Sequence, residues 1–255
     1  MIIYYSDLKM ITVRRREFDF NKSPKYFFKK NKFVTHFLNA LSTSFPPGED
    51  FFVRSVRRFR KNDKSQLEKD ISAFIGQEAF HSLAHKAMNE YASKFDLPLE
   101  QIQTALDVAI KAIETHLTPK QCLAITIALE HYTAVMGEEL LTNPKWLEGM
   151  VMPHKELWRW HASEEVEHKS VAFDVYRKNC NDYLTRIITM TIIHAVFLTV
   201  ILIITGSLML KDKEMSMFEK MDQTIYGTWL LFGPNGFITN IAKKLPQYYK
   251  PGFHP

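Results

Sequence analysis

The sequence predicts an all-α protein in which a bundle of helices precedes a hydrophobic helical region. Two observations support this fold class. From about Phe33 onward, apolar residues recur at intervals of three and four positions, as in helices with one buried face, and no alternating pattern typical of strands competes with them. After Arg186, residues 187–210 carry no formal charge and are long enough as a helix to cross a bilayer.

Length and composition indicate a folded chain. Its 255 residues are 46% hydrophobic, which is enough for one large domain, or for one domain with an appendage, and which argues against a disordered chain. We divide the chain into an N-terminal arm (1–32), a helical bundle (33–182) and a hydrophobic, membrane-associated C-terminal region (183–255).

Helix breakers separate the expected elements. Residues 1–24 have an irregular pattern that ends at Pro24, so we expect an extended arm there. Prolines with glycine or polar neighbours at positions 46–48, 96–98, 118–119 and 143–144 then interrupt the helical periodicity, because proline is tolerated in a first helical turn but not in an interior. The predicted helices cover residues 33–45, 49–61, 66–95, 99–116, 119–141 and 153–180.

The uncharged stretch at 187–210 has two interpretations. Threonine, serine and histidine residues dilute its hydrophobicity, so a buried core helix is the alternative to membrane insertion. Basic residues flank it on both sides and predict no orientation. A second apolar stretch, residues 226–241, is interrupted at 233–236 and predicts a hairpin or an interfacial segment. We favour membrane association, on the cytoplasmic side of a bacterial inner membrane.

Charge and cysteine content restrict the partners. The net charge is +5, and basic residues cluster at 14–16, 29–32 and 54–61, which indicates an anionic partner. We favour lipid headgroups over nucleic acid, because no nucleic-acid-binding motif accompanies these clusters. Cys122 and Cys180 are too few for a disulfide framework or a thiolate metal site, which favours a reducing compartment. The first ten residues do not resemble a secretory signal.

The stretch WHASEEVEH combines two histidines with three glutamates. On a helical wheel His161, Glu165 and His168 fall within about 60° of one another, beside the apolar arc that holds Ala172. A solvated acidic surface would place them on the opposite side, where Glu167 points. The spacing therefore predicts that the H-x-x-x-E-x-x-H residues face inward as ligands.

Three further helices place acidic residues on apolar faces. In GQEAFHSLAHK, Glu78, His81 and His85 continue an apolar stripe, and Glu130 lies within the stripe of ALEHYTAV. Glu49, in FPPGEDFF, begins a helix and shares a face with apolar neighbours, although the helix dipole also favours a glutamate in a first turn. Buried carboxylates need cations or donors nearby, and metal ions meet that need directly.

Taken in chain order, these residues match a known ligand pattern. Two helices that give one glutamate each and two that give Glu-x-x-His are typical of ferritin-like four-helix bundles with a dinuclear metal site. We expect His85 and Glu138 beside the ligands or along a channel. The alternative is a set of core histidines with surface ion pairs. The predicted metal ligands and catalytic residues are Glu49, Glu78, His81, Glu130, His161, Glu165 and His168.

The ligand types favour two iron ions. Four carboxylates neutralise two divalent ions, and a shell of carboxylate oxygens and imidazole nitrogens suits iron or manganese, with zinc as a further alternative. No cysteine belongs to the set, which disfavours metals that prefer thiolates.

These residues resemble two known groups of proteins. The strings FPPGEDFF, GQEAFH, LEHYTAV, HASEEVEHKSVAFDVY and YYKPGFHP are similar to the bacterial family named predicted metal-dependent hydrolases, and the similarity covers most of the chain. His161, as a third histidine beside the usual six ligands, resembles the pattern of the di-iron arylamine N-oxygenases. The ligand pattern alone carries this second likeness.

We expect a membrane-associated di-iron enzyme that uses O2 to oxidise or oxygenate a hydrophobic small molecule or lipid. An external electron donor would be required, because no flavin or nicotinamide motif is present. The first alternative is a dinuclear metal-dependent hydrolase of an ester, amide or phosphoester. The second is a non-catalytic metal-binding protein. We allow for a homodimer and expect no nucleic-acid partner.

Overall fold

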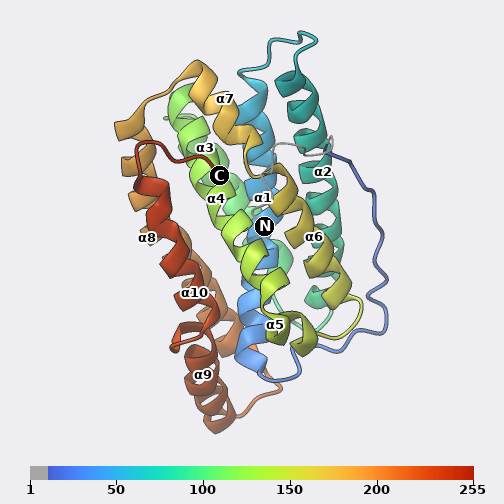
Figure 1. The fold of residues 1–255 in the computed structure, drawn as a ribbon. Coiled ribbons are helices and arrows are strands. Elements are labelled where there is room, and N and C mark those ends of the chain that lie inside the picture. The colour runs from blue at the N-terminus through green and yellow to red at the C-terminus, as the bar shows by residue number, and fades with distance from the viewer. Residues whose placement is uncertain (1–10) are drawn as a thin grey trace.

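In a computed structural model, which describes residues 11–255, the regular elements of that range are all helical (Figure 1). The all-α prediction is confirmed for these residues. Residues 11–31 precede the first helix, and residues 1–10 of the predicted arm lie outside the described range. The elements are α1 (Lys32–Arg57), α2 (Gln66–Ser93), α3 (Leu99–Glu114), α4 (Pro119–Thr142), α5 (Pro144–Gly149), α6 (His154–His168), α7 (Val171–Asn179), α8 (Tyr183–Lys211), α9 (Met217–Phe232), α10 (Phe237–Lys244) and a 3-10 helix (Leu245–Tyr249).

Helix α1 continues through Pro46 and Pro47, where the sequence predicted a break. Pro46 has no N–H to donate to the carbonyl oxygen of Ser42, four residues earlier. Asn89 Nδ2 on α2 donates to that oxygen instead, over 3.1 Å. The helix stays continuous because a neighbouring helix supplies the missing donor, and Glu49 therefore lies inside α1 and not in a first turn.

The helix predicted over residues 153–180 is two helices, α6 and α7, which are separated by Lys169 and Ser170. Neither a proline nor a glycine marks this break, so the sequence gives no breaker signal there. His168 is the last residue of α6. The apolar residues beyond it belong to α7, which packs separately against α4 and α2.

The four helices that carry the candidate ligands lie side by side (Figure 1). Helix α1 packs against α2 and α4, and α6 packs against α4 and α2. Helix α4 begins with a capping box in which Thr118 and Gln121 satisfy each other's backbone N–H groups. Pro119 in the first turn of α4 loses no helical hydrogen bond. This arrangement gives the four helices a shared interior.

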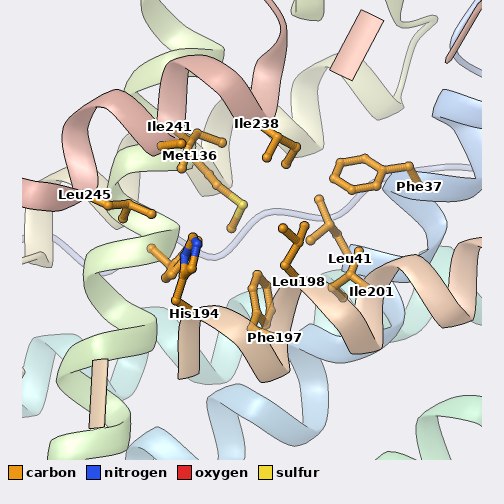
Figure 2. Close-up of a pocket in the computed structure, with 12 residues that line it drawn as sticks. Phe37, Leu41, Met136, His194, Phe197, Leu198, Ile201, Ile238, Ile241 and Leu245 are labelled. Atoms are coloured by element: carbon orange, nitrogen blue, oxygen red, sulfur yellow. The ribbon is translucent and has the colours of Figure 1, made fainter. Parts of the chain in front are cut away.

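One hydrophobic core joins the predicted bundle to the C-terminal region. The predicted boundaries fall at the starts of α1 and α8, but buried residues of α8, α9 and α10 belong to the same apolar cluster as those of the preceding helices. Figure 2 shows the contact of α8 with α4 and α10, where side chains such as Met136, Phe197 and Ile241 leave a cavity of only about 20 Å³. That volume holds about one water molecule, so the C-terminal helices are closely packed on the bundle.

The opposite face of α8 is exposed and apolar. The most hydrophobic 18-residue window of α8 has a mean hydropathy of 2.7, and α8 is, among the described residues, the one helix that is long and apolar enough to cross a membrane. Only 17% of its most hydrophobic window is buried, which does not fit the alternative of a buried core helix. Exposed residues follow one another along this face at Leu184, Ile188, Ile192, Val196 and Ile203.

Asp212, at the end of α8, links this helix to the arm and to α1. Its buried carboxylate accepts hydrogen bonds from Lys25 Nζ (2.7 Å) and Tyr26 OH (2.9 Å), and His36 Nε2 lies 2.9 Å away. Burial alone would raise the pKa of Asp212, but the hydrogen bonds from His36 and Lys25 hold it well below its ordinary value. The folded protein therefore strongly favours the charged carboxylate.

Asp212→Asn should lower the free energy of unfolding at neutral pH by about 1.5–3 kcal/mol, because the buried Lys25 loses its closer acidic partner. The carboxylate contributes fully above the pKa of an unfolded aspartate, about 3.9, and its contribution is lost as the pH falls below that value, since the unfolded chain then takes up the proton first. Urea titrations should therefore show a steeper loss of stability below about pH 4 for the wild type than for the variant.

Asp96→Asn is the control, because the Asp96 side chain is 80% exposed and lies 3.7 Å from Lys213. Equal stability losses in the two variants would contradict the role of Asp212.

Candidate metal centre

The seven predicted ligands all lie in the interior between α1, α2, α4 and α6, and none is more than 4% exposed. The structure therefore brings together residues that are more than a hundred positions apart in the chain, and their role as ligands stays a prediction. Helix α1 supplies Glu49, α2 supplies Glu78 and His81, α4 supplies Glu130, and α6 supplies His161, Glu165 and His168.

Overlapping groups of ligand atoms form one cluster. In each of three groups the candidate atoms lie within 4.8 Å of one another. Glu165 Oε1 is 2.9 Å from His161 Nε2, and Glu165 Oε2 is 3.6 Å from His168 Nε2, so this carboxylate reaches both ends of the cluster. The three groups are Glu49 with His81 and His161, Glu78 with His81 and Glu165, and Glu78 with Glu130 and His168. They overlap because Glu78 and His81 each occur in two of them.

The carboxylates of this cluster lack the donors that buried anions need. Among the described residues, no hydrogen bond reaches the oxygens of Glu49, Glu78 or Glu130, all of which are buried. His168 Nε2 lies 3.0 Å from Glu78 Oε1 without hydrogen-bond geometry, so this close contact does not satisfy either atom. Unpaired buried carboxylates are costly, and cations placed between them would offset that cost. The residues present therefore fit a metal centre.

The pKa values of the cluster show the same need for cations. Burial, followed by the charge of Glu78, raises the pKa of Glu49 well above its ordinary value and that of Glu130 to about 8. Burial and the neighbouring His81 lower the pKa of His161 to about 4, so this imidazole is neutral at pH 7. Burial alone would lower the pKa of His81, but its hydrogen bonds to Glu164 and Glu165 raise it to about 9. Metals bind deprotonated carboxylates and neutral imidazoles, so loading would release protons from Glu49, Glu130 and His81.

Two polar side chains determine which histidine nitrogen faces the cluster. His81 Nε2 donates to Glu164 at 3.0 Å and leaves Nδ1 turned toward Glu165, at 3.4 Å. His168 Nδ1 donates to Gln77 Oε1 at 2.9 Å and leaves Nε2 turned toward the cluster. Hydrogen bonds of this kind hold an imidazole in the tautomer that can bind a metal.

The N-terminal arm supports the same histidines from outside. Arg14 donates to Glu164 at 3.0 Å and to both oxygens of Glu167, at 2.7 and 3.1 Å. Glu167 in turn accepts a hydrogen bond from Gln77 Nε2 at 2.8 Å. Glu167 thus faces away from the cluster, toward the arm. These residues, except Gln77, border a polar surface cavity of about 580 Å³.

A separate network on α1 and α2 orients His161. The Ser42 hydroxyl donates to Asn89 Oδ1 at 2.7 Å, so it accepts from His85 Nδ1, which lies 2.9 Å away. His85 Nε2 then carries no proton and accepts from His161 Nδ1 at 2.7 Å. His161 Nε2 then faces the cluster, in hydrogen-bond contact with Glu165 Oε1 at 2.9 Å and 3.7 Å from Glu49 Oε1, and in the neutral ring it is the nitrogen that could bind a metal.

The two residues predicted beside the ligands have different positions. His85 touches His161, as just described. Glu138 does not reach the cluster, and this expectation is corrected: its carboxylate pairs with Lys169 and Lys244 at 3.3 Å each and is 36% exposed. The reason is geometrical, because two turns of helix separate Glu138 from Glu130 and rotate it by about 80°.

Several supporting residues escaped the sequence analysis. Gln77 and Ser42 carry no ligand chemistry of their own, and only their hydrogen bonds to His168 and His85 give them a role. Arg14 reaches α6 only through the path of the arm. Neither spacing nor residue type signals such partners.

A family model described as a predicted metal-dependent hydrolase matches residues 12–255. The chain belongs to this family. The match includes every helix and most of the described arm, and it agrees with the first of the two resemblances seen in the sequence. Neither curated proteins nor solved structures gave a match to the chain.

Membership in the predicted metal-dependent hydrolases contradicts the expectation of O2-dependent oxidation and agrees with the alternative of a dinuclear hydrolase. O2 and an electron donor were expected only because an oxidation was expected, so that expectation no longer has support. The physical reason is that the ligand set does not decide between the two chemistries. A cluster of glutamates and histidines can hold a metal that activates oxygen or a metal that activates water.

Glu78→Gln and His168→Ala should each lower the metal content per chain, measured by elemental analysis after loading and desalting, because each removes a candidate ligand atom. Gln77→Leu should weaken metal affinity about 10–100-fold without abolishing it, since it removes the hydrogen bond that orients His168. Glu138→Gln is the control and should load like the wild type. Full metal content in Glu78→Gln would argue against the cluster as the binding site.

Proposed function

We propose that the protein is a hydrolase that uses two divalent metal ions, held in a ferritin-like four-helix bundle formed by α1, α2, α4 and α6. The main support is the convergence of four buried carboxylates, three of which have both oxygens without a donor. The arrangement has two ends and a middle, as two adjacent cations would require. Glu49 and His161 lie at one end, Glu130 and His168 at the other, and Glu78 and Glu165 between them, with His81 beside Glu165.

Iron, manganese and zinc all suit this set of oxygen and nitrogen ligands. Hydrolysis requires no change of oxidation state, so zinc and manganese serve as well as iron. When bound, a pair of such ions lowers the pKa of a water molecule and polarises a carbonyl or phosphoryl oxygen.

The chain itself supplies the orientation on which that chemistry depends. Glu164, Gln77 and His85 each hold one histidine in the tautomer that directs a lone pair into the cluster. The candidate ligands would be oriented before any metal binds, because each of these partners is itself buried and makes a further hydrogen bond to the arm or to a neighbouring helix.

The exposed apolar faces of α8 and α9 support membrane association. Phe218 and Trp229 of α9 are 82% and 62% exposed. Since α8 packs along α1 and α4, it cannot cross a bilayer without drawing those helices in as well. We therefore favour a protein that lies on the membrane, with Lys211, Lys213 and neighbouring lysines facing anionic headgroups. The cytoplasmic side of the bacterial inner membrane and a homodimer remain predictions.

A double variant, Phe218→Asp with Trp229→Asp, should bind anionic phospholipid vesicles at least about tenfold more weakly than the wild type in flotation assays, since burial of one large apolar side chain contributes about 1.5–3 kcal/mol. The control is Leu83→Asp, because Leu83 is 62% exposed on α2, away from this face. Equal vesicle binding by the wild type and the double variant would exclude the proposed orientation.

The hydrolytic function is tested with metal-free protein that is reloaded with zinc or manganese under nitrogen and assayed against esters, amides and phosphoesters. We expect turnover without oxygen or reductant, and a loss of turnover to background in Glu78→Gln. Stoichiometric metal binding without turnover of any of the three bond types would contradict the proposal and favour a non-catalytic metal-binding protein.

A further inference from the structure

An apolar pocket of about 230 Å³ adjoins the ligand cluster between α1, α3, α4 and α8. Glu49 and Glu165 form part of its lining. The hydroxyls of Ser44 and Thr133, which also line it, donate to the carbonyl oxygens of Leu41 and Glu130 within their own helices. The rest of the lining is apolar, which suits a hydrocarbon and disfavours a charged or sugar-like molecule.

The pocket runs from the surface to the ligand cluster. Ile113 of α3 and Val196 of α8 line it and are 58% and 51% exposed, whereas Glu49 and Glu165 are 2% and 4% exposed. Val196 also belongs to the exposed apolar face of α8. A hydrocarbon chain can therefore pass from that face to the ligand cluster along an apolar wall.

The pocket has a limited length. Phe197 and Ile201 of α8 line both this pocket and the small cavity of Figure 2. A volume of 230 Å³ holds roughly eight groups of the size of a water molecule. The space therefore accommodates a single hydrocarbon chain of medium length.

We propose that this pocket binds the hydrocarbon chain of an acyl ester or amide and places the scissile carbonyl at Glu49 and Glu165. The inference rests on the proposed hydrolytic function and adds the substrate class to it. In the reaction a water oxygen joins the acyl carbon, the bond from that carbon to the alcohol oxygen or amine nitrogen breaks, and the leaving group takes up a proton. The products are a fatty acid and an alcohol or amine, so no oxidant or reductant is needed.

A substitution at Gly48 offers a specific way to fill the pocket. It lines the pocket next to Glu49, and a Cβ at this position would meet only Phe52, at 4.0 Å. Gly48→Leu would fill the pocket without displacing backbone, and it should not weaken α1, because glycine is a poor helix former. Gly206→Leu is the matched control, since a Cβ at Gly206 of α8 meets nothing within 4 Å and this glycine lines a different surface pocket.

Binding of hexanol, octanol and decanol tests the pocket separately from hydrolysis, because these neutral probes need no metal. In calorimetry with chelated and with metal-loaded protein, affinity should rise about fourfold per methylene until the pocket is full. Gly48→Leu should weaken decanol binding at least about tenfold at unchanged metal content, and Gly206→Leu should not. Equal affinity for the three alcohols, or equal losses in the two variants, would overturn the inference.

Hydrolysis then distinguishes the sources of the acyl group. The metal-loaded protein is given monomeric acetyl and decanoyl esters, and acyl lipids in vesicles. Preference for the monomeric decanoyl ester identifies a soluble acyl compound, and cleavage confined to vesicles identifies a membrane lipid. Faster cleavage of the acetyl ester would refute the acyl-chain pocket. Absence of all hydrolysis, with alcohol binding intact, would contradict the proposed function and leave the chain-binding pocket standing.

Discussion

The four glutamates that meet in a buried interior impose the constraint on which the rest of the structure depends. Carboxylates this close repel one another, and burial raises the pKa of Glu49 and Glu130. Only protons or cations between them relieve that repulsion. His161 is hydrogen-bonded to Glu165, but no hydrogen bond joins His168 to Glu78, and both oxygens of Glu49, Glu78 and Glu130 stay without a donor. Metal ions, which the family and the cluster both suggest, would relieve the repulsion directly.

The same polar contacts serve the backbone and the site. Asn89 donates to the Ser42 carbonyl that Pro46 leaves without a donor, and it accepts from the Ser42 hydroxyl. That hydroxyl accepts from His85, which orients His161. The irregular stretch of α1 and the tautomer of a candidate ligand thus depend on one residue of α2. Loss of Asn89 would disturb the helix and the ligand together.

Helical periodicity predicted that the seven candidate ligands face a shared interior, because burial and helix geometry act within one element, where spacing alone fixes the direction of a side chain. Predictions from periodicity were wrong where contacts with another helix, or a longer distance along the same helix, decide the outcome. Pro46 does not end α1 because Asn89 supplies a donor, and Glu138 turns outward because a small angular offset grows over two turns. The prediction of an oxygen-dependent reaction was wrong for another reason. Ligand identity determines which ions bind, whereas the choice between oxygen and water depends on what else reaches the metals.

The ligand cluster has an apolar wall on the side of α8 and charged neighbours on the side of the arm, and these two sides differ in their electrostatic effect on the cluster. Toward α8 the wall is apolar, so nothing there screens Glu49 or Glu165. Toward the arm, Glu164 and Glu167 would add two further negative charges to a centre that already has four carboxylates. Arg14 pairs with both and offsets one of these two charges. The arm is therefore an electrostatic part of the site, and the family match, which begins at residue 12, includes it. Removal of the arm would leave Glu164 and Glu167 without their arginine partner and raise the repulsion within the cluster, although no residue of the arm lines the apolar pocket.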